Sequence, residues 1–128
     1  MKLLLDTHIL LWAAGNPEKL SKRARTTLLE PGNSLYFSAA SIWEVVIKQS
    51  LGRDDFKVDA LRLRKMLIVN RYGELSITSE HVLRVDALPT LHKDPFDRLL
   101  IAQALSEGML LVTVDEAVIA YQDGVLAV

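Results

Sequence analysis

Two runs of consecutive apolar residues constrain the fold of this chain more than any other feature. They are "KLLLD" at residues 2–6 and "MLLVTVD" at residues 109–115. A strand with one face in water alternates apolar and polar residues, whereas a strand buried on both faces reads as a continuous apolar run. The two runs therefore predict central strands of a sheet that is covered on both faces.

Segments with helical spacing or helix-boundary residues separate these runs. Strands that alternate with helices predict an α/β/α sandwich with a mainly parallel sheet, formed as a single domain over residues 1–128. Further strands are expected at 34–39 and 74–78, and the final "VLAV" follows the last helix. The expected helices cover 7–15, 22–30, 38–52, about 60–69, a stretch from 79, 95–108 and the segment "DEAVIAYQDG".

Composition restricts the class of protein. Half of the 128 residues are hydrophobic and the net charge is only −1, so a nucleic-acid partner would have to be held by local basic patches. The sequence has no cysteine, which excludes disulfides and thiolate metal sites and fits a reducing compartment. It shows neither an export signal nor a membrane span, and we expect a cytoplasmic protein.

Four acidic residues occupy positions where ligands gather in α/β sheets, at the carboxyl ends of strands. Asp6 and Asp115 follow the two apolar runs directly. Glu44 and Asp97 lie near the starts of two predicted helices, and those starts share an edge with the strand ends in an alternating fold. We therefore expect these four carboxylates to converge.

Structural interpretations of two of these residues stay open. Glu44 could form a capping box with Ser41, because "SIWE" fits the S-x-x-E pattern, and could pair with Lys48 one turn later. Asp115 could simply cap the short helix after it.

Asp6 and Asp97 are harder to explain as surface residues. Asp6 interrupts "LLLDTHILLW", and Asp97 heads the apolar stripe of Leu100 and Ile101, where a lone charge is costly. Asp97 also suits the helix dipole, three residues after the expected cap Asp94. Clustered carboxylates repel unless a cation lies among them, and oxygen ligands favour Mg²⁺ or Mn²⁺.

The remaining polar and aromatic residues carry weaker signals. The three histidines lack metal-ligand spacing and are expected as helix, packing or edge residues, and the aromatic residues are expected in the core rather than as base-stacking surfaces. Basic residues at 19–25 usually form a solvated face, with contacts to phosphate as the minority interpretation. The residues concerned are His8, His81 and His92; Trp12, Trp43, Tyr36 and Phe37; and, as candidates for RNA phosphates, Arg23, Arg25 and Arg98.

Four segments in order, "LLLDTHILLW", "SAASIWEVVIK", "HKDPFDRLLIAQAL" and "LLVTVD", resemble the PIN-domain family, and most of all the VapC-type toxins of toxin–antitoxin pairs. The resemblance implies a Mg²⁺- or Mn²⁺-dependent ribonuclease with RNA as substrate, a cognate antitoxin as partner and a homodimer as assembly. Carried over by motif, it makes Asp6, Glu44, Asp97 and Asp115 the catalytic metal ligands, with Thr113 and Asp94 in support.

Other functions fit the sequence less well. A phosphatase of the haloacid dehalogenase type needs a second aspartate where this chain has His8, and a proofreading exonuclease needs D-x-E on the first strand. A non-catalytic RNA-binding or regulatory domain stays open as the alternative. The apolar excess, including Leu20, Leu28 and Leu29, favours a dimer.

Overall fold

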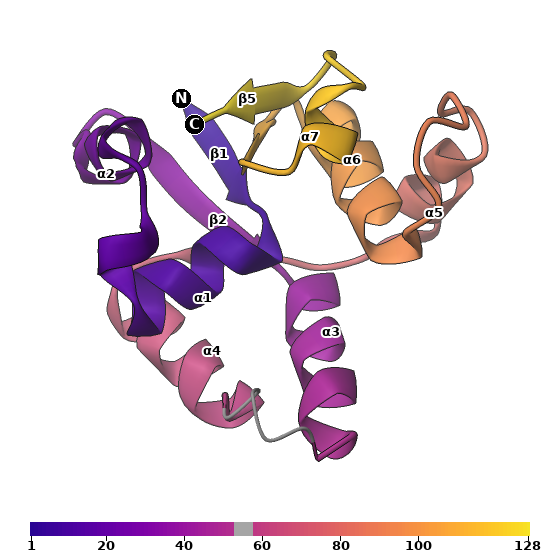
Figure 1. Ribbon diagram of the computed structural model, residues 1–128. Coiled ribbons are helices and arrows are strands. Elements are labelled where there is room, and N and C mark those ends of the chain that lie inside the picture. The colour runs from indigo at the N-terminus through magenta and orange to yellow at the C-terminus, as the bar shows by residue number, and fades with distance from the viewer. Residues whose placement is uncertain (53–57) are drawn as a thin grey trace.

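A parallel sheet of five strands forms the centre of the protein in the computed structural model, which describes residues 1–52 and 58–128 (Figure 1). All four strand pairings are parallel, and β1 lies in the middle of the order β3-β2-β1-β4-β5. The two runs that were predicted as central strands are β1 and β4, which pair with each other. The strands are β1 (Lys2–Leu5), β2 (Ser34–Ser38), β3 (Gly73–Leu75), β4 (Leu110–Thr113) and β5 (Val125–Ala127).

Helices cover both faces of the sheet and explain why its central strands are apolar throughout. Along β1, Leu3 and Leu5 point into one core with α1, α2 and α4, and Leu4 points into a second core with α6 and α7. All three leucines are fully buried. The helices are α1 (Thr7–Gly15), α2 (Lys22–Leu29), α3 (Ala39–Ser50), α4 (Ala60–Val69), α5 (Ser79–Val85), α6 (Pro95–Glu107) and α7 (Glu116–Ile119), with a 3-10 turn at Pro17–Lys19.

Short polar side chains fix the starts of α1, α3, α6 and α7, and three of these helices, α1, α3 and α7, follow strands. An oxygen at the N-cap accepts a backbone N–H that the first helical turn leaves unpaired. Asp6 does this for α1, Ser38 for α3, Asp94 for α6 and Asp115 for α7. Three of these four caps come directly after a strand or within two residues of it, so the carboxyl edge of the sheet is lined with polar groups.

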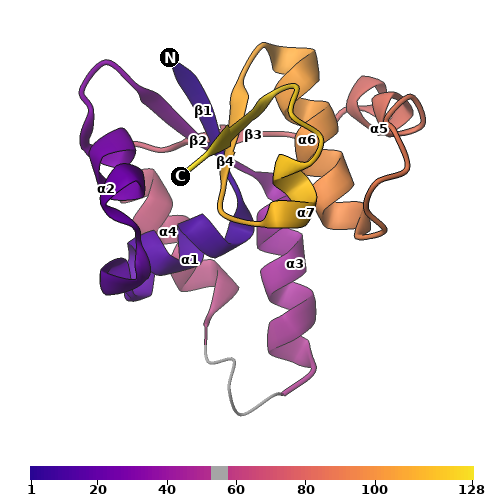
Figure 2. The same ribbon diagram turned by 45° about the horizontal axis from the view of Figure 1, so that its top comes forward.

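The arrangement brings segments far apart in sequence to one edge of the sheet. Because the strands are parallel, the carboxyl ends of β1, β2 and β4 lie side by side, and α1, α3 and α7 begin there (Figure 2). The start of α6 approaches the same edge, because Phe96 in its first turn packs against Trp43 of α3, and the helix as a whole contacts both β4 and α3. This edge is where the sequence predicted a site.

Two expectations need correction. The third strand covers Gly73–Leu75, whereas 74–78 was predicted, because Ser76 and Ile77 form the connection to α5. Trp43 was expected in the core, but 57% of its surface is exposed. Its ring packs edge-on against that of Phe96, with 5.1 Å between the ring centroids. No helix among the described residues is long and apolar enough to cross a membrane.

Candidate active site

Asp6 is the most deeply placed of the four acidic residues. It follows β1 directly, and only 4% of its surface is exposed. Its Oδ1 accepts the backbone N–H of His8 at 3.0 Å, and its Oδ2 accepts the hydroxyl of Thr113 at 2.6 Å. Burial raises the pKa of Asp6 above its ordinary value, although these two hydrogen bonds oppose the shift.

Thr113 connects Asp6 to Asp115. The Thr113 hydroxyl donates to Asp6 and accepts the backbone N–H of Asp115 at 3.1 Å. Asp115 caps α7 by accepting the N–H of Ala117 on Oδ1 at 2.9 Å, as the structural interpretation predicted. The cap uses only one carboxylate oxygen, so capping and a role at the site are compatible.

Glu44 lies buried on α3 and contacts the residue after Asp6. Its Oε1 accepts the hydroxyl of Thr7 at 2.8 Å, and its Oε2 pairs with Lys48 at 3.2 Å. The predicted ion pair with Lys48 is confirmed, but the predicted capping box with Ser41 is wrong. The helix begins three residues earlier, with Ser38 as its N-cap, and the Ser41 hydroxyl instead lies 2.9 Å from that of Thr7.

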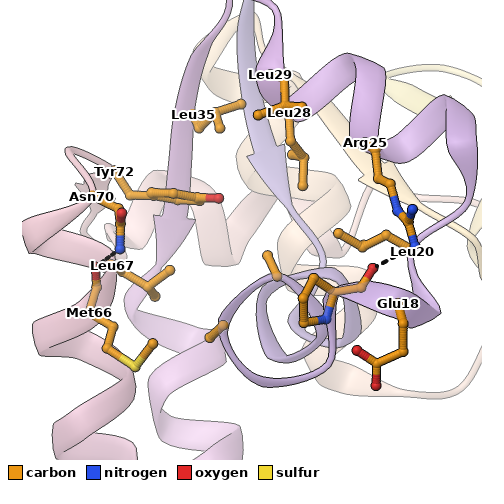
Figure 3. A pocket seen from close by; sticks show the side chains of 13 residues that line it. Glu18, Leu20, Arg25, Leu28, Leu29, Leu35, Met66, Leu67, Asn70 and Tyr72 are labelled. Atoms are coloured by element: carbon orange, nitrogen blue, oxygen red, sulfur yellow. Dashed lines mark hydrogen bonds between the residues drawn. The ribbon is translucent and has the colours of Figure 1, made fainter.

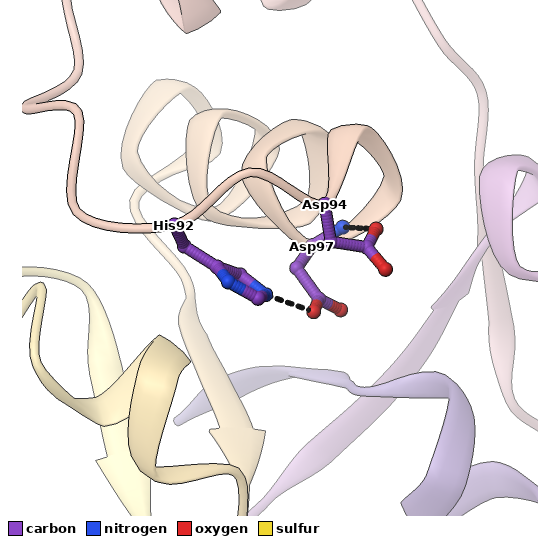
Figure 4. A group of neighbouring side chains, drawn as sticks. All are labelled: His92, Asp94 and Asp97. Carbon is purple, nitrogen blue, oxygen red and sulfur yellow. Dashed lines mark hydrogen bonds and ion pairs between the residues drawn. The ribbon is translucent and has the colours of Figure 1, made fainter.

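Asp97 stands in the first turn of α6 and is held from two directions (Figure 4). Asp94 caps the helix and accepts the backbone N–H groups of Phe96 and Asp97 on Oδ1, at 2.8 and 3.1 Å. The side chain of Asp97 is met by His92, whose Nε2 lies 2.8 Å from Oδ2. The stripe below it is apolar as predicted, because Leu100 and Ile101 are fully buried.

Charge effects connect Asp6, Glu44 and Asp97, whereas Asp115 is connected to Asp6 through Thr113. Burial raises the pKa of Asp97 to about 6, and the charges of Asp94 and Asp6 add to this effect while His92 opposes it. The charge of Glu44 likewise adds to the raised pKa of Asp6. Among the described residues, no lysine or arginine forms an ion pair with Asp6 or Asp97. We name Asp6, Glu44, Asp97 and Asp115 the acidic rim.

The donor set of the acidic rim fits a hard divalent cation. Carboxylate oxygens are the ligands that Mg²⁺ and Mn²⁺ prefer, and a cation among them would offset both the burial of the Asp97 charge and its repulsion by neighbouring carboxylates. Among the described residues, one group of three possible ligands lies within 4.8 Å of one another, close enough for a shared ion; it consists of His92, Asp94 and Asp97 and so includes only Asp97 of the acidic rim. The residues present are therefore suited to such a metal.

Comparison with known proteins agrees with this geometry. The family described as "PIN domain" matches residues 3–123, nearly the whole chain. The chain belongs to the PIN domain family. A curated relative, "Ribonuclease VapC22" of Mycobacterium tuberculosis (strain ATCC 25618 / H37Rv), is 30% identical over 114 residues, which are 88% of this chain and 86% of that protein.

Solved structures share the fold of this PIN domain at low sequence identity. VapBC2 from Rickettsia felis, crystallised with a DNA fragment from its promoter, aligns with a TM-score of 0.70 at 18% identity, over 100% of this chain and 98% of that one. VapBC-1 from nontypeable Haemophilus influenzae aligns with a TM-score of 0.63 at 18% identity, over 100% of this chain and 97% of that one. The predicted PIN-like fold and the resemblance to VapC-type proteins are confirmed.

Of the three arginines that were predicted to contact phosphates, Arg23 and Arg25 lie apart from the acidic rim of the PIN domain, whereas Arg98 directly follows Asp97 on α6. Arg25 donates to the carbonyl of Pro17 at 3.2 Å, beyond the end of α1 that is remote from Asp6. The length of α1 therefore separates it from the rim by about 13 Å, and Arg23 is exposed on the same helix as Arg25. Arg98 donates to the carbonyl of Val85 at 3.1 Å and so ties α6 to the end of α5.

Two residues at the site were not predicted from the sequence. Thr7 is buried against Glu44, and His92, expected only as a packing or edge residue, contacts Asp97. A signal for His92 was present, because it opens the "HKDPFDR" segment that carried much of the family resemblance. Thr7 likewise lies in a segment that carried the resemblance, "LLLDTHILLW", but a threonine after a strand is common at helix starts and did not stand out.

Proposed function

We propose that this PIN domain is a divalent-metal-dependent endoribonuclease that acts in the cytoplasm as the toxin of a toxin–antitoxin pair. The observation that carries the proposal is the acidic rim, where Asp6 and Glu44 are buried and Asp97 and Asp115 are half-buried. Among the described residues, neither Asp6 nor Asp97 forms an ion pair with an arginine or lysine. The relation to a protein named a ribonuclease supports RNA as the substrate.

Each member of the site has a part in this proposal. The four carboxylates of the acidic rim would hold Mg²⁺ or Mn²⁺, which when bound polarises the phosphodiester and lowers the pKa of a water molecule. Thr113 orients Asp6 by donating to Oδ2, and Thr7 orients Glu44 in the same way. Asp94 fixes the first turn of α6 and hence the backbone of Asp97.

The direct test is cleavage of a mixed RNA substrate with Mg²⁺, with Mn²⁺ and with EDTA. We expect internal cuts that require one of the two ions and disappear in the chelator. Asp6→Asn provides the matched control, because it keeps the size of the side chain and the cap but removes the charge. Cleavage that persists in EDTA, or activity confined to phosphomonoesters such as p-nitrophenyl phosphate, would contradict the proposal, and RNA binding without cleavage would favour the non-catalytic alternative.

A groove between α1, α2 and α4 offers a site for the antitoxin (Figure 3). Its volume is about 750 Å³ and its walls are mostly apolar, with Leu28, Leu29, Met66 and Tyr72 on opposite sides and Arg25 at the edge. Leu29 is 81% exposed and Met66 is 42% exposed, so apolar surface is open to a partner. An apolar segment of a small protein, helical or extended, would bury this surface.

Substitution of Met66→Glu tests the groove. A charge there should weaken binding of the product of a neighbouring short reading frame by at least about tenfold, while RNA cleavage is retained. Leu61→Glu, at an exposed position of the same helix that does not line the groove, is the control. Equal antitoxin binding by both variants would place the partner elsewhere.

Exposed apolar side chains on two further helices support the expected homodimer. Helices α3 and α5 both pack against α6, and they expose Trp43, Val46, Val82 and Leu83 to water. The leucines that first favoured a dimer lie elsewhere, because Leu20 is buried and Leu28 and Leu29 line the groove. Light scattering at micromolar concentration should show a dimer, and Leu83→Glu should shift it toward the monomer. A monomeric wild-type protein would contradict this part of the proposal.

A further inference from the structure

We infer that His92 is a positioning residue that orients the carboxylate of Asp97 toward the acidic rim. The inference rests on the proposed function only in that a divalent cation binds at the rim. It concerns a residue that the four-acid pattern does not include. The observation behind it is the contact of 2.8 Å between His92 Nε2 and Asp97 Oδ2.

The direction of this hydrogen bond follows from the chemistry of the two groups. An ionised carboxylate can only accept, so Nε2 of the imidazole carries the hydrogen and donates it to Oδ2. This bond occupies Oδ2 and restricts rotation of the Asp97 side chain. Oδ1 is then left as the oxygen that is directed to a cation.

The backbone and the side chain of Asp97 are fixed by different residues. Asp94 accepts the backbone N–H of Asp97 at 3.1 Å and so sets where the helix begins. His92 reaches the same residue from the preceding loop and holds only its carboxylate (Figure 4). Loss of His92 therefore frees the ligand without removing the helix cap.

Histidine is suited to this position because it can donate without carrying a permanent charge. A lysine or arginine at 2.8 Å would neutralise Asp97 and weaken its attraction for a cation. The contact is also shielded, with 22% of the His92 side chain and 16% of the Asp97 side chain exposed. Groups that orient metal ligands in this way commonly change metal affinity by about 10–100-fold when they are removed.

The competing role for His92 is direct ligation. The cluster of His92, Asp94 and Asp97 is compact enough for one ion to contact all three. Imidazole is a ligand that suits Mn²⁺ better than Mg²⁺, so loss of a histidine ligand would affect Mn²⁺ affinity more. Loss of a positioning residue should weaken both ions by the same factor, because the lost order of Asp97 is common to both.

The experiment measures Mg²⁺ and Mn²⁺ affinity of the whole chain by calorimetry, without RNA. His92→Phe removes the donor, and His92→Gln keeps an N–H that can reach Asp97. Lys93→Gln is the matched control, because Lys93 is the exposed neighbour on the same loop. Melting curves in EDTA establish that each variant is folded.

We expect His92→Phe to bind both ions about tenfold or more weakly than wild type. The affinity of His92→Gln should stay within about threefold of wild type, and that of Lys93→Gln should equal wild type. Unchanged affinity in His92→Phe, equal loss in His92→Gln and His92→Phe, or a larger loss for Mn²⁺ than for Mg²⁺ would overturn the inference. A wild-type protein that binds neither ion would also overturn it. Metal binding that depends on His92 in a protein that cleaves no RNA would leave the inference standing while the proposed function fails.

Discussion

Among residues 1–52 and 58–128, the PIN domain buries polar groups in two places, and the two clusters differ in how their hydrogen bonds are matched. In the first, which we name the His81 cluster, His81 is 1% exposed and Gln103 is fully buried. His81 Nδ1 accepts the backbone N–H of Thr78 at 3.1 Å, and its Nε2 lies 2.7 Å from Glu107. Gln103 accepts the hydroxyl of Ser38 at 2.6 Å. Each donor in this cluster meets an acceptor of the same chain.

The acidic rim lacks that complementarity. Thr113 and Thr7 donate to Asp6 and Glu44, but the pKa values of Asp6 and Asp97 are still raised, mainly by burial and further by the charge of Glu44 on Asp6 and of Asp6 on Asp97. Buried polar groups stabilise a fold when they are matched, and they cost stability when they are not. The comparison teaches that the His81 cluster is completed by folding, whereas the rim would be completed by the cation that we propose to bind there.

The largest effect is expected from Asp97→Asn, which removes a charge from the rim but keeps its shape. RNA cleavage should fall by at least about 100-fold, and metal-induced stabilisation should decline with it. The metal-free protein should melt at a higher temperature than wild type, because one repelling carboxylate is gone.

Asp94→Asn is the matched control for that change, since asparagine also caps helices well and should cost only a few tenths of a kcal/mol. Melting curves with and without metal, run beside the cleavage assay, decide the outcome. Full activity in Asp97→Asn would make Asp97 a mere helix-start residue.

Thr113→Val should have the next largest effect and tests how the rim is organised. Valine keeps the volume of the side chain but removes the hydroxyl that donates to Asp6 and accepts from Asp115. Mn²⁺ affinity measured by calorimetry should fall about tenfold or more. Thr113→Ser, which restores the hydroxyl, should recover most of the affinity. Equal losses in both variants would point to packing rather than to the hydrogen bond.

Gln103→Leu, in the His81 cluster, should lower the stability of the fold and leave metal affinity unchanged. The substitution leaves the buried hydroxyl of Ser38 without its partner at 2.6 Å. The free energy of unfolding in urea should fall by about 2 kcal/mol, while the affinity for Mn²⁺ changes little. A tenfold loss of metal affinity in this variant would mean that the two clusters are coupled, through Ser38 at the start of α3.

The smallest predicted effect is a dependence of metal-free stability on pH. The pKa of Asp97 is raised to about 6, so the folded protein takes up a proton there before the unfolded chain does. Stability must therefore rise as the pH falls from 7 to 5, by about 1 kcal/mol for this residue. Urea unfolding of wild type and of Asp97→Asn at both pH values measures it. The variant should lack this gain, and an identical gain in both proteins would contradict the prediction.

Much of this organisation could be predicted from the sequence because its signals are local. The apolar runs that form β1 and β4 are buried on both faces, and the acidic residue after each run lies at the sheet edge. Asp97 could be placed because its spacing to Leu100 and Ile101 puts all three on one helix face. These inferences required only the periods of helices and strands.

The rest depended on contacts that no local period encodes. The bond between His92 and Asp97 depends on the path of a loop, and the one between Thr7 and Glu44 depends on how α1 and α3 meet. The capping box at Ser41 failed because α3 begins three residues earlier, where Ser38 is the N-cap, and the Ser41 hydroxyl contacts that of Thr7 instead. Trp43 looked like a core residue by type, but its place on α3 turns it outward against Phe96.

The central position of β1 gives the protein a built-in order of assembly during its synthesis. Asp6 needs the hydroxyl of Thr113, which lies 107 residues later in the chain. At translation rates of about 5–20 residues per second, roughly 5–20 s pass between the two residues. All residues that line the groove, from Ala13 to Tyr72, emerge from the ribosome within that interval. If the groove receives the antitoxin as proposed, the chain can meet its inhibitor on the ribosome before it is able to harm the cell that makes it.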